Sequence, residues 1–155
     1  MNELEEISRR VRPLRTLWLA MIAGIVLFTV TVMFLIRIGA VTPIPVLRAG
    51  AGATIAIILV IAMVGAQYVR KLVEKTPASA TRSQVANKWQ AGWIAGQAIK
   101  EGIGLLGLVL ALLVGVSSWA LAFGAASAIS MLMTPPWEAE LLHRLQDAEP
   151  DPEGP

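Results

Sequence analysis

The longest apolar runs of this chain decide what it can fold into, because they are too long for the interior of a small soluble domain. The first run, from Thr16 to Gly39, holds 24 residues with one charged side chain, Arg37. About 20 residues of helix cross the hydrocarbon layer of a membrane, whereas the core of a signal peptide has about 7 to 15. The run therefore predicts a retained transmembrane helix at 16–39.

Three further apolar segments, at 46–70, 91–116 and 119–134, predict three more transmembrane helices. Only 15% of the 155 residues are charged, against about 25% in soluble domains, and the charges are clustered between the runs. The fourth segment has 16 residues, rich in alanine, glycine and serine, and would be a thin or tilted crossing. We therefore expect an all-α integral membrane protein whose four transmembrane helices form one domain, 16–134.

The amino-terminal segment, residues 1–15, is polar and ends in basic residues. Leu4, Ile7 and Val11 fall at helical spacing, which predicts a short amphipathic helix lying on the membrane surface. Pro13 should break this helix from the first span, because proline lacks a backbone N–H group.

Two more polar stretches complete the expected layout. Residues 72–89 are expected to form a solvent-exposed loop, with a short helical extension of the second span as an alternative for its start. Trp89 or Trp93 should then lie at the membrane interface. The tail, 135–155, starts with the helix-like segment EAELLHRLQ and ends in DAEPDPEGP. Proline and acidic residues at that density predict a disordered acidic tail.

Basic residues are distributed unevenly between the segments that flank the spans, and this predicts orientation. Cytoplasmic flanks carry the excess of lysine and arginine in membrane proteins. We therefore expect both termini in the cytoplasm, in a multi-pass protein of the bacterial inner membrane. The side predicted to be cytoplasmic holds Arg9, Arg10, Arg12, Arg15, Arg70, Lys71, Lys75, Arg82, Lys88 and Arg144, and the other side holds Arg37 and Arg48.

Composition narrows the possible chemistry. The chain has no cysteine and a single histidine, His143, so a cysteine nucleophile, a thiolate site and a multi-histidine metal cluster within one chain are excluded. Phosphate-binding glycine loops, nucleophile elbows and metal-ligand spacings are also missing from the sequence. We expect a protein that is not an enzyme, with no cofactor or metal and no nucleic-acid partner.

The charged pair Lys100 and Glu101 inside the third span is the first functional candidate. An ionisable group at the centre of a bilayer costs about 2.5 to 3.5 kcal/mol, so it usually faces protein, water or a counter-charge. Neighbouring residues lie about 100° apart on a helix, so the two side chains cannot share one face. Gln97, one turn earlier, could donate a hydrogen bond to Glu101. Three roles are possible for this pair. The two residues could anchor the helix at the interface or form a structural ion pair, Glu101 could carry an ion, or the pair could contact a partner subunit or a lipid headgroup.

Two strips of small residues predict close helix packing. Gly92, Gly96 and Gly104 recur at multiples of four residues in line with Lys100, and Ala122, Ala126 and Ser130 do so in the fourth span. Ordinary packing between transmembrane helices is the simpler interpretation, and a dimer interface is the alternative.

The string Glu101-Gly-Ile-Gly-Leu-Leu-Gly-Leu-Val-Leu-Ala-Leu-Leu113 resembles the second helix of the proteolipid (c) subunits of rotary ATP synthases. Arg82-Ser-Gln84, nineteen residues before the acid, is similar to the polar loop of that family. The resemblance covers residues 82–113, and a lysine beside the acid departs from the family pattern. It implies a distant relationship in which Glu101 takes the place of the ion-carrying carboxylate.

The small size and the lack of catalytic groups favour a non-catalytic accessory or structural subunit of a larger membrane complex. The alternatives are a proton- or ion-translocating protein that uses Glu101 and a membrane assembly factor. Expected partners are other integral membrane subunits, with anionic lipids near the basic cytoplasmic segments.

Overall fold

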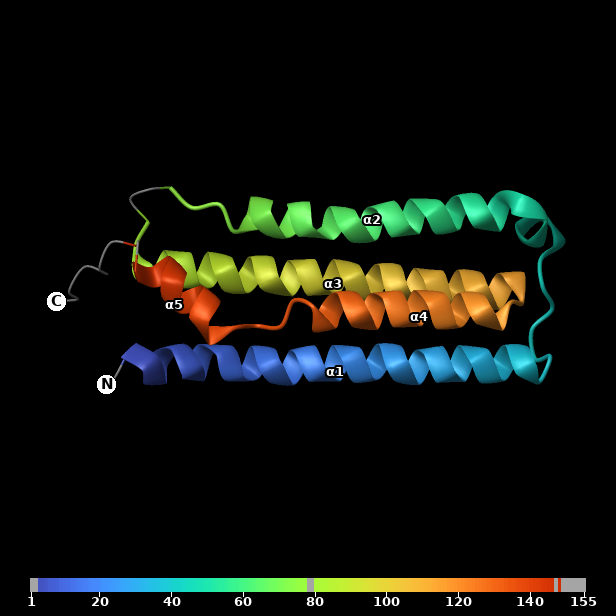
Figure 1. Ribbon diagram of the computed structural model, residues 1–155, viewed down its shortest axis with the longest axis horizontal. Coiled ribbons are helices and arrows are strands. Elements are labelled where there is room, and N and C mark those ends of the chain that lie inside the picture. The colour runs from blue at the N-terminus through green and yellow to red at the C-terminus, as the bar shows by residue number, and fades with distance from the viewer. Residues whose placement is uncertain (1–2, 78–79, 147, 149–155) are drawn as a thin grey trace.

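A computed structural model describes residues 3–77, 80–146 and 148, and in them the chain is almost entirely helical (Figure 1). The expected all-α class is therefore confirmed. Three helices are long and apolar enough to cross a membrane, and a fourth apolar helix is shorter. The elements are α1 (Glu3–Arg37), a π-helical turn (Leu47–Ala51), α2 (Gly52–Val73), α3 (Arg82–Val114), α4 (Ser117–Leu132) and α5 (Glu138–Gln146).

Helix α3 lies at the centre of an up-and-down bundle (Figure 1). It packs against α2 on one side and against α4 and α1 on the other, and α1 also packs against α4. The amino terminus of α1, the α2–α3 connection and α5 lie together at one end, which we call the basic end (Figure 1). This arrangement gathers the ten basic residues counted above at the same end of the bundle, with Arg37 and Arg48 at the opposite end.

The predicted break at Pro13 is wrong, because α1 runs without interruption through 35 residues. A proline inside a helix costs about 3 kcal/mol or more. Ile7, Val11 and Leu14 are buried on one face of this stretch, and each such side chain contributes about 1.5 to 3 kcal/mol. Within the bundle the apolar stripe of Ile7, Val11 and Leu14 packs against protein and belongs to the first turns of α1, whereas the side chain of Leu4 lies outside the described residues.

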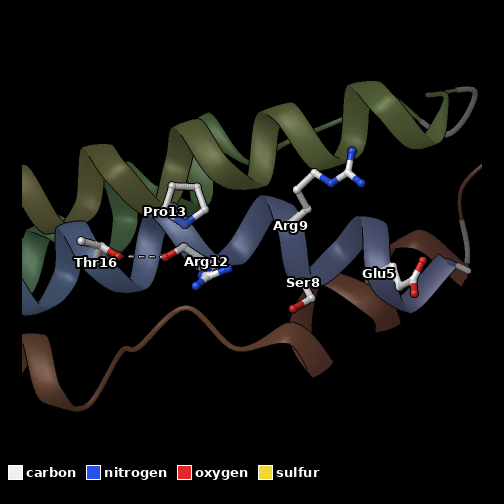
Figure 2. A pocket seen from close by; sticks show the side chains of 6 residues that line it. All are labelled: Glu5, Ser8, Arg9, Arg12, Pro13 and Thr16. Carbon is white, nitrogen blue, oxygen red and sulfur yellow. Dashed lines mark hydrogen bonds between the residues drawn. The ribbon is translucent and has the colours of Figure 1, made fainter. Parts of the chain in front are cut away.

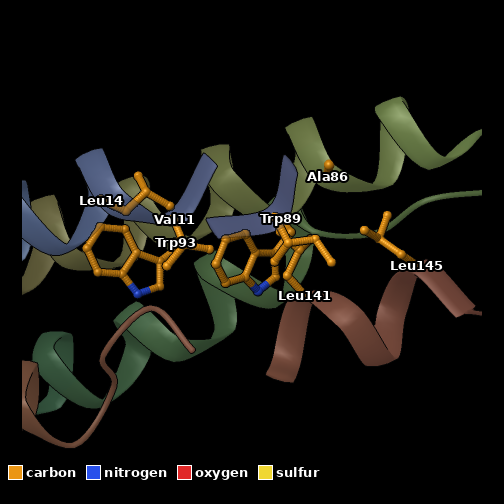
Figure 3. Packing of buried hydrophobic residues seen from close by; sticks show 8 residues of the cluster. Val11, Leu14, Ala86, Trp89, Trp93, Leu141 and Leu145 are labelled. Carbon is orange, nitrogen blue, oxygen red and sulfur yellow. The ribbon is translucent and has the colours of Figure 1, made fainter. Parts of the chain in front are cut away.

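The buried core at the basic end joins α1, α3 and α5 (Figure 3). Trp89 and Trp93 lie at its centre, with exposed fractions of 1% and 0%. Both tryptophans are therefore covered by protein, and their position relative to a membrane interface stays a prediction. The basic-end core consists of Ile7, Val11, Leu14, Ala86, Trp89, Trp93, Leu141 and Leu145.

The expected loop at 72–89 is much shorter in the structure. Helix α2 continues to Val73, and α3 starts at Arg82, where the backbone N–H of Thr81 donates to Oε1 of Gln84 at 3.3 Å. Such a cap satisfies a donor at the start of a helix, and burial of Ala86 and Trp89 holds the next turns. Polar composition alone therefore misled the prediction of a loop.

Glycine makes the tight turn between α3 and α4. Gly115 has φ 73°, a left-handed conformation that glycine adopts without steric cost, and its N–H donates to the carbonyl of Ala111 at 2.9 Å. A Cβ at this position would also lie 2.5 Å from Cγ of Pro43. The fourth apolar helix consequently starts two residues before the predicted 119, at Ser117.

The tail begins as expected, since EAELLHRLQ forms α5. Its apolar side chains Leu141 and Leu145 are buried in the basic-end core. The predicted disorder of 147–155 falls almost wholly outside the described residues.

Candidate functional site

The carboxyl end of α4 lies inside the bundle. This helix has 16 residues, so it is about 24 Å long, less than the thickness of about 30 Å of a hydrocarbon layer. After Leu132 the chain runs without regular structure to α5, alongside α1 and α3 (Figure 1). The last carbonyl groups of a helix have no partner within it, so they need donors from elsewhere.

Four side chains from α1 and α3 donate to this end of α4: Lys100 and Trp18 reach carbonyls of the helix itself, and Gln97 and Trp93 reach a carbonyl just beyond it. Lys100 Nζ donates to the carbonyl of Ser130 at 2.9 Å and to Oγ1 of Thr134 at 2.6 Å. Gln97 Nε2 and Trp93 Nε1 donate to the carbonyl of Thr134 at 2.8 and 3.1 Å. Trp18 Nε1 donates to the carbonyl of Met131 at 3.0 Å. We call these four donors, together with Ser130, Met131 and Thr134, the α4 cap.

Lys100 is buried, with 3% of its surface exposed, and its charge is placed next to the negative end of the α4 dipole. The predicted hydrogen bond from Gln97 to Glu101 is wrong, because the Gln97 amide is directed to Thr134. Among the described residues Lys100 has no carboxylate partner, so a structural ion pair with Glu101 is absent there. Lys100 is therefore directed into the bundle, where it holds the end of α4 in place.

Glu101 faces α1, on a different side of α3 from Lys100. Its Oε1 lies 3.9 Å from the position that a Cβ on Gly24 would occupy. Within the described part of the chain no hydrogen bond or ion pair reaches this half-buried carboxylate. Gly24 comes nine residues after Arg15 and thirteen before Arg37. At about 1.5 Å per residue, the Glu101 carboxylate therefore lies about 13 Å along the α1 axis from Arg15 and about 20 Å from Arg37.

The glycine strip of α3 contacts different helices along its length: the end of α2 at Gly92 and Gly96, and both α4 and α1 at Gly104. A Cβ on Gly92 would clash with the Glu74 side chain and one on Gly96 would lie 3.2 Å from Cβ of Arg70, both at the end of α2. A Cβ on Gly104 would lie 2.5 Å from Oγ of Ser127 on α4. Residues spaced by four drift about 40° per step around a helix, so a strip of twelve residues turns from one neighbour to the next.

The small strip predicted on α4 is not the packed face of that helix. Ala122 and Ala126 are exposed and Ser130 is half-buried. The packed face of α4 includes Phe123 and Gly124 instead: a Cβ on Gly124 would clash with Thr29 of α1, and one on Gly107 of α3 would clash with the Phe123 ring. Two small strips run along α4, and spacing alone could not decide between them.

Sequence analysis also missed a cluster of four charges that ties α2 to α5 at the basic end. Glu74, with 4% of its side chain exposed, accepts from Arg70 at 2.6 Å and from Arg144 at 2.7 Å. Glu140 accepts from the same two arginines at 2.6 and 3.3 Å. Two oppositely charged pairs at i, i+4 spacing were the only signal in the sequence.

A shallow hollow lies on the outer surface of α1 near the basic end (Figure 2). Arg9 and Arg12 provide positive charge at its wall, and the hydroxyl of Thr16 donates to the Arg12 carbonyl at 3.3 Å. Its lining residues are Glu5, Ser8, Arg9, Arg12, Pro13 and Thr16. The basic side chains and open shape suit an anionic group.

No protein-family model, curated protein or solved structure matches this chain. Among the described residues no group of three or more histidine, aspartate or glutamate side chains gathers that could hold a metal ion.

Proposed function

We propose that this protein is an integral membrane protein and a non-catalytic accessory subunit of a larger membrane complex. The uncovered apolar surface of α2 carries the proposal. Val60, Ile61 and Val64 are 54%, 66% and 65% exposed, and Gly52 and Ala66 are the buried residues of this helix. Soluble monomers rarely expose large contiguous apolar patches, so lipid or another subunit must cover this one.

Helix α1 supports the same conclusion from the other side of the bundle. Leu27, Val30 and Phe34 are all exposed on it. With α3 between α1 and α2, apolar surface faces outward on both flanks of the bundle (Figure 1). This geometry suits a chain that is embedded in lipid and inserted between the helices of partner subunits.

The charge distribution supports an orientation in a bacterial inner membrane with both termini and the α2–α3 connection on the cytoplasmic side. The basic end holds ten lysine and arginine residues and the opposite end two. The hollow beside Arg9 and Arg12 favours binding of anionic lipid headgroups at the cytoplasmic surface.

Ion translocation is the second candidate, and one observation favours it. Glu101 lies within an apolar segment with its Oε1 beside Gly24 of α1, and none of the described residues pairs with its carboxylate; ionisable residues in such segments often mark ion pathways. The resemblance of residues 82–113 to rotary proteolipid subunits points the same way. Against this candidate, α1 and α4 flank α3 within one chain, whereas a carrier ring would need the carboxylate to face a moving partner.

Gentle detergent extraction followed by size separation tests the proposal. Co-migration with other membrane proteins at a fixed ratio is the expected result. Recovery as a homomeric ring would favour ion translocation, and recovery as a monomer in mild detergent would contradict the subunit proposal.

A further inference from the structure

One face of α3 is left uncovered by the rest of the bundle. Ala91, Ile94, Ala98, Leu106 and Val109 are exposed on it, and we call them the open face. The other sides of α3 are occupied: Gly92 and Gly96 face α2, Gly107 faces α4, and Glu101 faces Gly24 of α1. The open face therefore runs between α1 and α2, on the side away from α4.

The open face is apolar and has small residues beside Glu101. Ala98 lies three residues before the acid, Gly102 follows it, and a Cβ on Gly102 would meet no atom within 4 Å. Small residues let the backbone of another helix approach closely. Glu101 lies at the edge of this surface, between the open face and α1.

The two charges of α3 are treated differently by the fold. Lys100 is directed inward and donates to Ser130 and Thr134. Glu101 is directed toward the edge of the open face, and no described residue pairs with it. A carboxylate about 13 Å from the Arg15 level is too deep for a glutamate side chain to reach the headgroups, and an unpaired charge is unfavourable in an apolar layer.

We propose that the open face of α3 binds a transmembrane helix of a partner subunit, and that this helix carries a lysine or arginine at the depth of Glu101. The inference rests on the proposed function as an accessory subunit and names the surface and chemistry of the contact. Charge complementarity selects a basic group. A lipid phosphate at this depth is excluded by its own negative charge and by the distance to the surface.

Cross-linking in native membranes tests the inference. A photoreactive benzoylphenylalanine replaces Ile94 on the open face of the full-length chain, and a matched probe replaces Ile129 on the exposed side of α4. The expected product from position 94 contains a transmembrane peptide of another subunit with lysine or arginine in its apolar segment. Glu101→Gln should lower the yield of this product at least fivefold, and Glu101→Asp should retain it.

A second variant separates a lost contact from a lost fold. Ala98→Trp places a bulky side chain on the open face without touching the bundle interior, and it should lower co-migration as strongly as Glu101→Gln. Ala126→Trp on the exposed side of α4 is the control and should leave co-migration unchanged. Glu101→Lys alone should disrupt the complex. Combining it with replacement of the partner's basic residue by glutamate should restore the complex, because the two charges are then exchanged.

Other results would overturn the inference. Three results would each contradict it. The Glu101→Gln variant could cross-link as well as wild type, the captured peptide could lack a basic residue, or the product could contain a second copy of this chain. If vesicles that contain the Glu101→Gln variant lose ion flux across the membrane while cross-linking is unchanged, Glu101 is assigned to ion carriage. If the wild-type protein has no co-migrating partner, the proposed function itself fails. If the complex forms but substitution of Glu101 leaves it unchanged, only the inference fails.

Discussion

Nζ of Lys100 on α3 lies 2.6 Å from the hydroxyl oxygen of Thr134, two residues beyond the end of α4. The same ammonium group donates to the carbonyl of Ser130. A short helix that ends inside the bundle leaves polar backbone groups away from water. The contact explains how α4 can end inside the bundle and why a lysine is present in an apolar helix.

Removal of the ammonium group should therefore destabilise the bundle. Lys100→Met keeps the length of the side chain but leaves the Ser130 carbonyl and the Thr134 hydroxyl without this donor. Hydrogen bonds between transmembrane helices contribute about 1 to 2 kcal/mol at most, so a loss of about 1 to 3 kcal/mol is expected for the two. Tryptophan fluorescence during thermal unfolding in detergent measures it, since Trp18 and Trp93 belong to the α4 cap.

Lys88→Met is the control for this change, because Lys88 is exposed on the same helix. It should leave the midpoint of unfolding unchanged. Equal midpoints for Lys100→Met and wild type would show that the α4 cap does not depend on the ammonium group.

Two glycines of α3 should respond in opposite directions to the same substitution. Gly107→Ala places a Cβ against the Phe123 ring and should destabilise the packing of α3 on α4 by about 1 to 3 kcal/mol. Gly102→Ala meets no atom within 4 Å and should be neutral or stabilising by up to about 1 kcal/mol. Unfolding in detergent by a denaturant compares the two, and a similar loss for both would contradict the close contact of α3 with α4.

The buried charge cluster should hold α5 against the end of α2. Glu74→Gln removes the carboxylate shared by Arg70 and Arg144, and loss of one partner from a buried pair costs about 3 to 5 kcal/mol, less here because Arg144 is partly exposed. Limited proteolysis should then cleave near α5 faster than in wild type. A double-mutant cycle with Arg144→Met isolates the pair energy.

The exposed pair of Arg15 and Glu138, at 3.2 Å, provides the comparison for the buried cluster. Arg15→Met should change α5 protection little, because exposed ion pairs contribute about 0 to 1 kcal/mol. If both variants release α5 equally, charge burial is not what holds the helix.

Single cysteines can map orientation cleanly, because the natural chain has none. Thr76→Cys and Gln146→Cys lie at the basic end and should react with a membrane-impermeant maleimide only after the membrane is opened. Ser118→Cys lies at the opposite end and should react in intact spheroplasts. The reverse pattern would contradict the cytoplasmic placement of both termini.

Sequence alone determined the helical class, the number of apolar segments and the grouping of basic residues. These properties depend on composition and on the length of uninterrupted apolar runs such as 16–39. The need to satisfy backbone hydrogen bonds in an apolar layer makes such a run helical whatever its tertiary neighbours are. The helical start of the tail could be read in the same local way.

Tertiary structure decided which partner each polar and small residue meets. Pro13 remains inside a helix because Val11 and Leu14 are buried by α3 and α5, and Gln97 turns to Thr134 because α4 ends there. Spacing gives the direction of a side chain around its own helix but carries no information on which helix lies in that direction. For that reason the separation of Lys100 from Glu101 followed from helix geometry, whereas the α4 cap and the uncovered face beside Glu101 depended on how the helices pack.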